Sequence, residues 1–242
     1  MNVDFRTALE QPEQGFVVDR SADSTVAMVA FGGIAGGLQI PPFEFFALAG
    51  SIPVTKVFVR DLDQAWYQRG IRGLGGSIST AADSLRSVLD DAGAARVVGF
   101  GNSAGGFGAI LFGHALELDE VHAFAPQTFI DRRRRLWYRD RRWGRPIRAL
   151  RRSPPDGAVD DLRPLCLAAG GPTIHVHVNA SHRLDRAHAD RIEGGARVTV
   201  HRHASGGHAL VAHLRDTNAL GAIIRGALDG PGDLDDVRER RS

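Results

Sequence analysis

The sequence is short of cysteine, of lysine and of long apolar stretches, and each shortage narrows what the protein can be. Cys166 has no second cysteine with which to form an internal disulfide, and nothing around it suggests an activated thiol, so we expect a buried, inert side chain. No apolar run approaches the roughly 20 residues of a membrane-spanning helix. The first residues lack the basic and apolar regions of a signal peptide. We therefore expect a cytoplasmic protein with no membrane partner.

The rest of the composition is that of an ordinary folded protein. Hydrophobic residues make up 43% of the 242 residues and charged residues 24%, and the formal net charge is +2. This length suits one α/β domain that carries an insertion. We expect a single domain over residues 1–242, with a core at about 15–126 and 166–228, an insertion at about 127–165 and a disordered tail at about 230–242, where apolar residues are few.

Short apolar runs alternate with amphipathic stretches along the core. Runs typical of buried strands occur at residues 15–19, 24–31, 54–59, 97–100, 121–125, 173–178 and 197–203. Helical patterns occur at residues 43–49, 79–90, 109–116, 186–192 and 209–228. This alternation predicts the α/β fold class, in which a mainly parallel sheet is covered by helices on both faces.

A sharp strand-to-helix turn is predicted at Ser103. The strand at 97–100 runs into residues 101–105 (GNSAG), which fit the pattern G-x-S-x-G, and helix-forming residues follow. In such a turn the serine has a strained backbone, and its hydroxyl stands at the N-terminus of the helix. Neighbouring chain passes so close to positions 101 and 105 that glycine is the residue that fits. Ser103 is therefore the candidate nucleophile, and the alternative is a small-residue turn that lets a helix pack close to a strand.

A serine hydroxyl needs a base to remove its proton, and the base needs an orienting acid. His208 lies in a small-residue loop directly after the last predicted strand, from which it can reach the carboxyl edge of the sheet; a solvent-facing histidine at a helix N-terminus is the alternative. Asp185 follows the preceding strand, and Asp190, in the helix beyond, is the alternative acid. Three other histidines are less well placed. They lie in the helix after Ser103, on a surface helix and inside the last helix, and are His114, His188 and His213.

The chain order Ser103, Asp185, His208 is the order found in α/β hydrolases, and the sequence resembles the α/β-hydrolase superfamily across roughly residues 15–228. The segments GNSAGGFGA, AFAPQTF and GGHALVAHLRD resemble a poorly characterised bacterial branch, whose members often accompany genes of polysaccharide or other biosynthesis. The resemblance implies the α/β-hydrolase fold and a catalytic triad made of these three residues. It does not imply a substrate.

The resemblance also implies an oxyanion hole. The N–H group of Ala104 would be one donor, and the loop at Gly32 and Gly33, after an early central strand, would supply the second. The glycine-rich stretch continues through residue 37, and a flexible connection is its alternative interpretation. The sequence departs here from lipases and esterases, because Phe31 precedes the two glycines where those enzymes have His-Gly-Gly-Gly.

Four further residues are candidates for contact with a substrate. Asp61 directly follows the strand at 54–59, at the edge where open α/β sheets bind ligands. Trp66 and Tyr67 come next and are candidates to line a pocket, although packing under a loop is the more common explanation for such aromatics. Asn102 is the neighbour of the candidate nucleophile.

The insertion is densely basic. Eleven arginines lie between positions 132 and 152, interleaved with Trp137, Tyr138 and Trp143. The segment is too long for an ordinary loop, so we expect a partly helical lid over the strand ends. Because it lies between core elements beside the candidate site, we favour attraction of an anionic substrate or carrier, or plain solubility, over nucleic-acid binding. No nucleic-acid partner is expected.

Histidines alternate on the last two predicted strands. His175 and His177 share one face of their strand, as do His201 and His203 on the next, so the four could gather around a metal ion. No aspartate or cysteine completes a ligand set at suitable spacing, which favours hydrogen-bonded strand histidines. We predict no metal and no cofactor.

Taken together, these patterns predict a serine hydrolase that acts on an ester or thioester through an acyl-enzyme at Ser103. The substrate would be a small or carrier-bound acyl compound, with an anionic one left open. An acyltransferase would use the same three residues with an acceptor other than water. The opposing class is a non-catalytic binding module that holds a partner through the arginine segment. The sequence predicts no oligomeric state.

Overall fold

A computed structural model of the chain describes residues 11, 13–21, 24–34, 45–50 and 52–230. Its strands are β1 (Phe16–Asp19), β2 (Val26–Phe31), β3 (Thr55–Val59), β4 (Arg96–Asn102), β5 (Glu120–Phe124), β6 (Thr173–Asn179) and β7 (Val198–His203). They form one seven-stranded sheet in the order β1-β3-β2-β4-β5-β6-β7. β1 is antiparallel to β3, and all other neighbours are parallel. The predicted mainly parallel sheet and its seven strands are confirmed.

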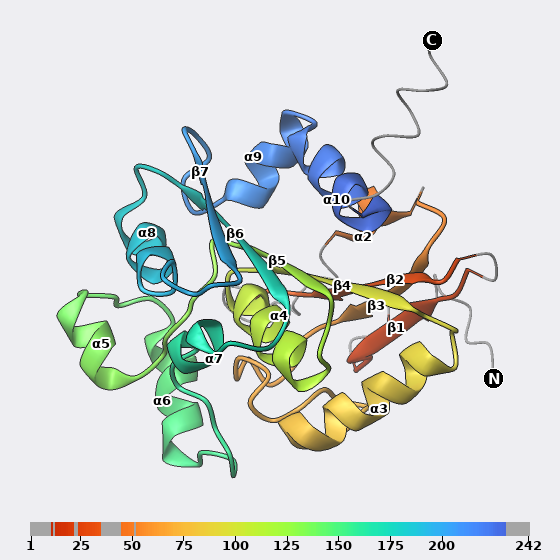
Figure 1. Cartoon of the computed structure of the whole chain (residues 1–242). Helices are drawn as coiled ribbons and strands as arrows, with labels where there is room; N and C mark the ends of the chain where they lie inside the picture. Colours follow the sequence, from red (N-terminus) through yellow and green to blue (C-terminus); the bar gives the residue numbers. More distant parts are fainter. Residues whose placement is uncertain (1–10, 12, 22–23, 35–44, 51, 231–242) are drawn as a thin grey trace.

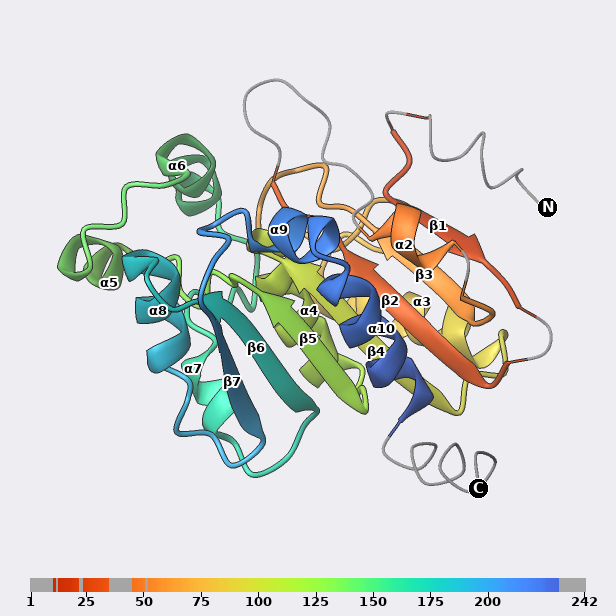
Figure 2. The ribbon, with the colours of Figure 1, turned by 90° about the horizontal axis from the view of Figure 1, so that it is seen from above.

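Helices cover both faces of the sheet (Figure 1). One face carries α3 (Ile78–Asp90), α4 (Ala104–Ala115), α7 (Arg163–Leu167) and α8 (Arg183–Asp190). The other carries α2 (Phe46–Ala49), α9 (Leu210–Asp216) and α10 (Ala219–Asp229). Figure 2 shows α9 and α10 lying over β2 and β4, whereas β6 and β7 lie to one side of them.

The predicted helices form, but α4 and α8 begin several residues earlier than expected, and the end of the chain differs as well. The helix expected over 209–228 is two helices, α9 and α10. Asn218 separates them in a left-handed conformation with φ 60°, which asparagine tolerates better than most residues. The hydroxyl of Thr217 donates back to the carbonyl of His213 and helps to end α9. Parts of three expectations, the glycines at 36–37, the helix start at 43–44 and the tail at 231–242, lie outside the described residues.

The middle of the chain has the partly helical form expected for 127–165. It contains α5 (Arg132–Trp137), α6 (Gly144–Arg152) and the start of α7, and a bridge between Phe129 and Asp161 ties its two ends together. Ile147 and Leu150 are buried in the core, so α6 is anchored to the rest of the molecule. A role as a lid stays a prediction.

Two simple expectations about composition can be compared with the structure. Cys166 is 2% exposed, and burial raises the pKa of its thiol to about 12, as expected for an inert cysteine. Within the described part of the chain, no helix has the length and apolar character needed to cross a bilayer.

The sheet face that carries α9 and α10 changes character from one side to the other. Over β2 and β4 it is apolar, with side chains such as Met28, Ala30 and Phe100. Over β5, β6 and β7 the corresponding positions carry five histidines whose rings stack in rows, with centroids 4.6 to 5.5 Å apart. These are His122, His175, His177, His201 and His203.

Candidate functional site

Ser103 occupies the strained turn that its sequence predicts. It stands between β4 and α4 with φ 54° and ψ −113°, outside the regions that residues with a side chain prefer. A Cβ on Gly101 would lie 2.1 Å from the carbonyl oxygen of Gly105, and a Cβ on Gly105 would lie 2.1 Å from that of Phe31. Both glycines are therefore required by close backbone approach, as expected. This close packing holds Ser103 in its strained conformation at the carboxyl end of β4, with 9% of its surface exposed.

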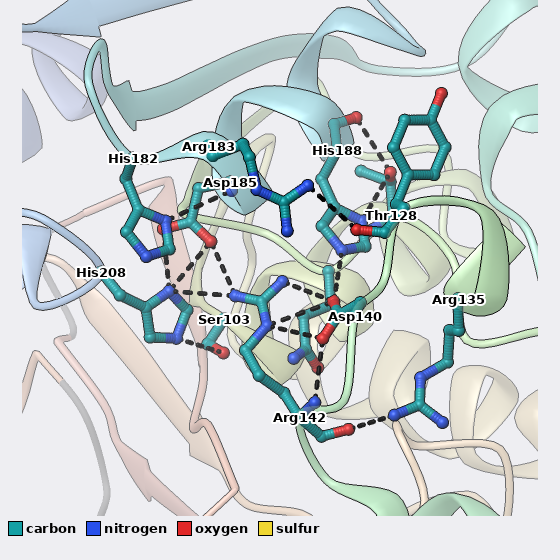
Figure 3. A network of polar contacts seen from close by, with 12 residues as sticks. Ser103, Thr128, Arg135, Asp140, Arg142, His182, Arg183, Asp185, His188 and His208 are labelled. Carbon is teal, nitrogen blue, oxygen red and sulfur yellow. Dashed lines mark hydrogen bonds and ion pairs between the residues drawn. The ribbon is translucent and has the colours of Figure 1, made fainter.

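The structure brings together the serine, histidine and aspartate that the sequence selects (Figure 3). The hydroxyl oxygen of Ser103 lies 3.4 Å from Nε2 of His208. Nδ1 of His208 lies 2.8 and 3.0 Å from the two carboxylate oxygens of Asp185. With Nδ1–H donating to the carboxylate, Nε2 presents its lone pair to the serine hydroxyl. The 3.4 Å separation is long for a hydrogen bond, and such contacts commonly shorten when a substrate binds.

The positions of Asp185, Asp190 and His188 differ in part from those that the sequence predicts. Asp185 is fully buried in the first turn of α8, although a position in the loop before the helix was expected. Asp190 forms an ion pair with Arg202 at 2.9 Å, and so it does not serve His208. His188, expected on the surface, is 1% exposed and packs its ring against Phe129.

Arg142 is the main site residue that sequence reasoning missed. Its guanidinium donates to the Asp185 carboxylate at 2.8 Å and to Asp140 at 2.7 Å. Asp140 in turn accepts a hydrogen bond from Nε2 of His188 at 3.2 Å, and Nδ1 of His188 accepts the N–H group of Thr128 at 2.9 Å. A continuous chain of polar contacts therefore runs from the protein interior to the triad.

His182 is a second imidazole beside the same carboxylate. Its Nδ1 lies 2.8 Å from Oδ2 of Asp185, and as the N-cap of α8 it accepts the backbone N–H group of Asp185 at 3.3 Å. A guanidinium nitrogen of Arg142 lies 3.4 Å from Nδ1 of His208, and because Nδ1 carries the hydrogen that it donates to Asp185, it cannot accept one from Arg142. Little in the sequence marks Arg142 among eleven arginines, but Asp140 is the one acidic residue between positions 132 and 152, and that was a usable signal.

The charges in this network are set by burial and by its partners. Burial raises the pKa of Asp185, but the hydrogen bonds and positive charges of His208 and Arg142 lower it more, so its pKa lies below the ordinary value. Asp140 follows the same pattern through His188 and Arg142, and its pKa lies far below the ordinary value. Burial lowers the pKa of His188, which is therefore neutral. Both carboxylates stay ionised at neutral pH.

The expected oxyanion donors are only partly available. Ala104 is the first residue of α4, so its N–H group has no partner within the helix. The N–H group of Gly32 donates to the carbonyl of Val59 at 2.9 Å, which is a correction to its expected role. Gly33 follows as the remaining candidate in this loop. A Cβ on Gly105 would lie 2.8 Å from the carbonyl carbon of Gly32, so the loop lies directly against the turn at Ser103.

Three of the four expected substrate contacts are structural residues instead. The carboxylate of Asp61 accepts the backbone N–H groups of Ala65 and Tyr67 at 2.6 and 3.0 Å and holds a tight turn. Trp66 is fully buried and donates to Gln127 at 2.7 Å. Tyr67 is also fully buried, and its hydroxyl donates to the carbonyl of Gly32 at 2.8 Å, where it supports the oxyanion loop. These three therefore do not face a substrate.

Contact of Asn102, the fourth expected residue, with a substrate stays a prediction. It is the last residue of β4, directly before Ser103, and is partly buried.

A basic groove of about 500 Å³ lies beside the site. It is lined by Arg132, Arg135, Leu136, Arg139, Asp140, Arg141, Gly144 and Arg151, which belong to α5, α6 and the segment between them. Neither Ser103 nor His208 lines this groove, but Asp140 belongs both to it and to the polar chain behind the triad. Arg142 also accepts a hydrogen bond at its carbonyl from Arg135 (Figure 3). The groove thus reaches the polar chain behind the triad at Asp140.

Two groups of side chains in the described part of the chain have the spacing of metal ligands. One is His182, Asp185 and His208, at the candidate active site. The other is Glu120, His122 and His175, on the sheet face that carries the stacked histidines. Burial lowers the pKa of His175 and of His201, and it lowers the pKa of His177 to about 2, so these three rings are neutral at pH 7.

Comparisons with known proteins identify the fold. No family model and no curated protein matches the chain. A solved structure of the capsule O-acetyltransferase of Neisseria meningitidis serogroup A is similar, with 15% identity, 87% of this chain and 90% of that chain covered, and a TM-score of 0.62. A histidine-to-alanine variant of that enzyme in complex with CoA covers 84% of this chain and 89% of its own, with 13% identity and a TM-score of 0.61.

Hydrolases are similar as well. An α/β serine hydrolase without a lid from Xanthomonas campestris is 16% identical over 89% of each chain, with a TM-score of 0.51. A lipase-esterase related protein from Clostridium acetobutylicum is 9% identical over 87% of this chain and 97% of that one, with the same TM-score. At these identities the likeness shows the fold, and the chain has the α/β-hydrolase fold that its sequence predicts.

Proposed function

We propose that the protein is a serine enzyme that transfers acyl groups through a covalent intermediate on Ser103. The observation that supports it best is the succession of contacts from the Ser103 hydroxyl to the His208 imidazole and on to the Asp185 carboxylate, at 3.4 and 2.8 Å. The strained backbone at Ser103 and the α/β-hydrolase fold are consistent with this function. The predicted hydrolase and the predicted acyltransferase share this first half of the reaction.

In the first half-reaction, Nε2 of His208 takes the proton from Ser103 as the serine oxygen attacks the carbonyl carbon of an ester or thioester. The carbonyl oxygen becomes an oxyanion, which the N–H groups of Ala104 and Gly33 would stabilise by about 3 kcal/mol per donor. Asp185 stabilises the imidazolium that forms. The tetrahedral intermediate collapses, the bond to the leaving group breaks, and His208 gives its proton to the departing alcohol or thiol.

In the second half-reaction, His208 removes a proton from the acceptor, whose oxygen attacks the acyl-enzyme, and returns that proton to Ser103 as the acyl group leaves. With water as the acceptor, the enzyme is the predicted hydrolase. Transfer to an alcohol is the second candidate, because the O-acetyltransferase structures superpose with TM-scores of 0.62 and 0.61, against 0.51 to 0.55 for several hydrolase structures. CoA in complex with one of them makes an acyl thioester the first donor to test.

The basic groove favours an anionic substrate. Arg132, Arg135, Arg139, Arg141 and Arg151 converge on one groove, and guanidinium groups suit bidentate binding of phosphate and carboxylate. Because Asp140 lines this groove and pairs with Arg142, an anion bound there would lie next to the polar chain behind the triad. We therefore propose that the acyl donor or the acceptor carries phosphate or carboxylate groups.

The intact mass of the protein after reaction with a fluorophosphonate probe tests the nucleophile. We expect one adduct on the wild-type protein and none on Ser103→Ala, while His208→Ala reacts about a thousandfold more slowly. An adduct on Ser103→Ala would place the reactive group elsewhere. Absence of an adduct on the wild-type protein would favour the binding-module alternative.

Incubation with acetyl-CoA separates the two acyl-transfer candidates. A hydrolase releases free CoA at the same rate with or without an alcohol acceptor, whereas a transferase accelerates when the acceptor is added. Anionic and neutral acceptors of similar size, compared at low and high salt, test the groove, because guanidinium binding of an anion weakens as ionic strength rises.

A further inference from the structure

The second group of possible ligands lies at the end of β5 away from Ser103. Glu120 and His122 point to the same face of β5 because they are two residues apart, and His175 pairs with His122 across the β5–β6 ladder. One oxygen of Glu120 lies 2.7 Å from Nε2 of His122 and 3.4 Å from Nε2 of His175. All three atoms lie within 4.8 Å of one another.

This spacing is that of the ligands around one metal ion. Ligand atoms that bind a tetrahedral zinc ion at about 2.1 Å lie about 3.4 Å from one another. Two imidazole nitrogens and one carboxylate oxygen form a donor set that binds divalent transition metals, and imidazole favours zinc, copper, iron and nickel over magnesium or calcium. The rings of His122 and His175 lie face to face, with centroids 4.7 Å apart, so both Nε2 atoms lie on the same side as the carboxylate.

The surrounding residues have the arrangement expected for the second layer of a metal site. A histidine that binds a metal through Nε2 needs an acceptor for its Nδ1–H group. Nδ1 of His122 lies 3.1 Å from Nε2 of His177, and Nδ1 of His175 lies 3.0 Å from Nε2 of His201. The other oxygen of Glu120 is held by Arg96 at 2.7 Å, which leaves the first oxygen directed to the histidines.

The site is also accessible. The side chain of His175 is 24% exposed and that of Glu120 is 18% exposed, while His122 is nearly buried at 8%. An ion bound here would be held on the protein side by His122 and would keep positions open to water. Packing alone does not account well for the five histidines. Three of them are only partly buried, and apolar residues would cover the sheet better.

We propose that Glu120, His122 and His175 bind a divalent transition-metal ion, with Zn²⁺ as the best match. The ion links β5 to β6 and is bound independently of the acyl-transfer reaction. The first ligand group, at Asp185, is a weaker candidate, because that carboxylate is fully buried and pairs with Arg142. A metal there would displace the hydrogen bond between Asp185 and His208.

Calorimetric titration of untagged, chelator-treated protein with Zn²⁺ alone tests the proposal. We expect one bound ion per chain, affinity at least about tenfold weaker in Glu120→Gln and in His175→Gln, and unchanged affinity in the control His182→Gln. His201→Phe, which removes the acceptor for Nδ1 of His175, weakens binding about tenfold. Visible absorption of bound Co²⁺ gives an independent measure of the ligand set in the same variants.

A rise in melting temperature on adding Zn²⁺ to the wild-type protein, absent in the ligand variants, supports the site through its link to folding. His175→Gln, at a partly exposed position, carries the test if Glu120→Gln does not fold. The proposal is overturned if the wild-type protein binds no zinc, if the ligand variants bind as well as wild type, or if affinity is lost only in His182→Gln.

Discussion

Two carboxylates in this molecule have the same kinds of neighbour but different surroundings. Each lies within 3.4 Å of two imidazoles and pairs with one guanidinium. The neighbours are His182, His208 and Arg142 for Asp185, and His122, His175 and Arg96 for Glu120. What separates the two clusters is the group beyond the imidazole. Nε2 of His208 faces the hydroxyl of Ser103, whereas Nδ1 of His122 and Nδ1 of His175 face further histidines.

The orientation of the rings is reversed as well. His208 presents Nδ1 to its carboxylate and keeps Nε2 for the serine, which suits proton transfer. His122 presents Nε2 to Glu120, so that this nitrogen and the carboxylate oxygen, both possible metal ligands, lie close together, which suits a cation. Asp185 is fully buried while Glu120 is 18% exposed, so water reaches only the second carboxylate readily. The same types of side chain therefore suit different chemistry in the two clusters, depending on which group lies beyond the imidazole and on access to water.

The largest effect is expected for Asp185→Asn. An asparagine cannot hold His208 in the tautomer that leaves Nε2 free, so the rate of fluorophosphonate labelling should fall by about 10³ to 10⁴. Labelling rates followed by intact mass measure this directly. The matched control is Asp190→Asn on the same helix, whose carboxylate pairs with Arg202 and which should label at nearly the wild-type rate. Equal losses in both variants would show that helix α8, rather than the Asp185 carboxylate, is what matters.

A large loss of stability is expected for Arg142→Met. The substitution leaves Asp140 and Asp185 buried without their guanidinium partner, and breaking a buried ion pair costs about 3–5 kcal/mol. Urea unfolding measures it, and Arg141→Met, at an exposed position, should change stability by less than about 0.5 kcal/mol. Arg96→Met should cost less than Arg142→Met, since its carboxylate is reached by water. A loss below about 1 kcal/mol for Arg142→Met would contradict the network.

Local patterns were enough to predict much of this structure. The strands, the turn at Ser103 and the glycines around it follow from short-range sterics and apolar spacing, and they are confirmed. The partners His208 and Asp185 could be selected because parallel strands end at one edge of the sheet, so the loops after them meet. Their catalytic roles stay a prediction.

Other features could not be predicted because they depend on side chains that meet only after folding. Arg142 acquires its importance from the two carboxylates that it contacts, and ten other arginines in the same segment share its local pattern. Trp66 and Tyr67 have the composition of a pocket lining, but a turn held by Asp61 turns both inward. Glu120 gains its histidine neighbours partly from another strand, which no spacing along one segment reveals.

A third buried carboxylate, Asp61, shows what happens without a basic partner. It accepts only backbone N–H groups, no cation in the described part of the chain pairs with it, and burial raises its pKa to about 6. Since its folded pKa exceeds the unfolded value of 3.8, it favours the folded state most below pH 3.8, and this contribution of about 3 kcal/mol is lost as the pH rises to about 6.

The free energy of unfolding of wild type relative to Asp61→Asn should therefore fall between pH 3.8 and about 6, the opposite of the trend expected for a carboxylate such as Asp185 whose pKa is lowered. Urea unfolding across this range measures the difference, with Asp83→Asn on the exposed face of α3 as the control. A difference that rises with pH would mean that Asp61 has a cationic partner.

The smallest effect, on the rate of fluorophosphonate labelling, is expected for His182→Gln. This variant tests whether the two imidazoles beside Asp185 are equivalent, as the two beside Glu120 are proposed to be. At Glu120 both imidazoles are proposed ligands of one ion, so either loss should weaken metal binding. At Asp185 the imidazoles are not equivalent, because only His208 reaches Ser103, and Arg142 keeps the carboxylate ionised when His182 is removed. Labelling of His182→Gln should therefore slow by less than about tenfold, against about a thousandfold for His208→Gln. Similar losses in both variants would mean that the reactivity of Ser103 depends on both imidazoles beside Asp185, and that the two clusters differ less than their geometry indicates.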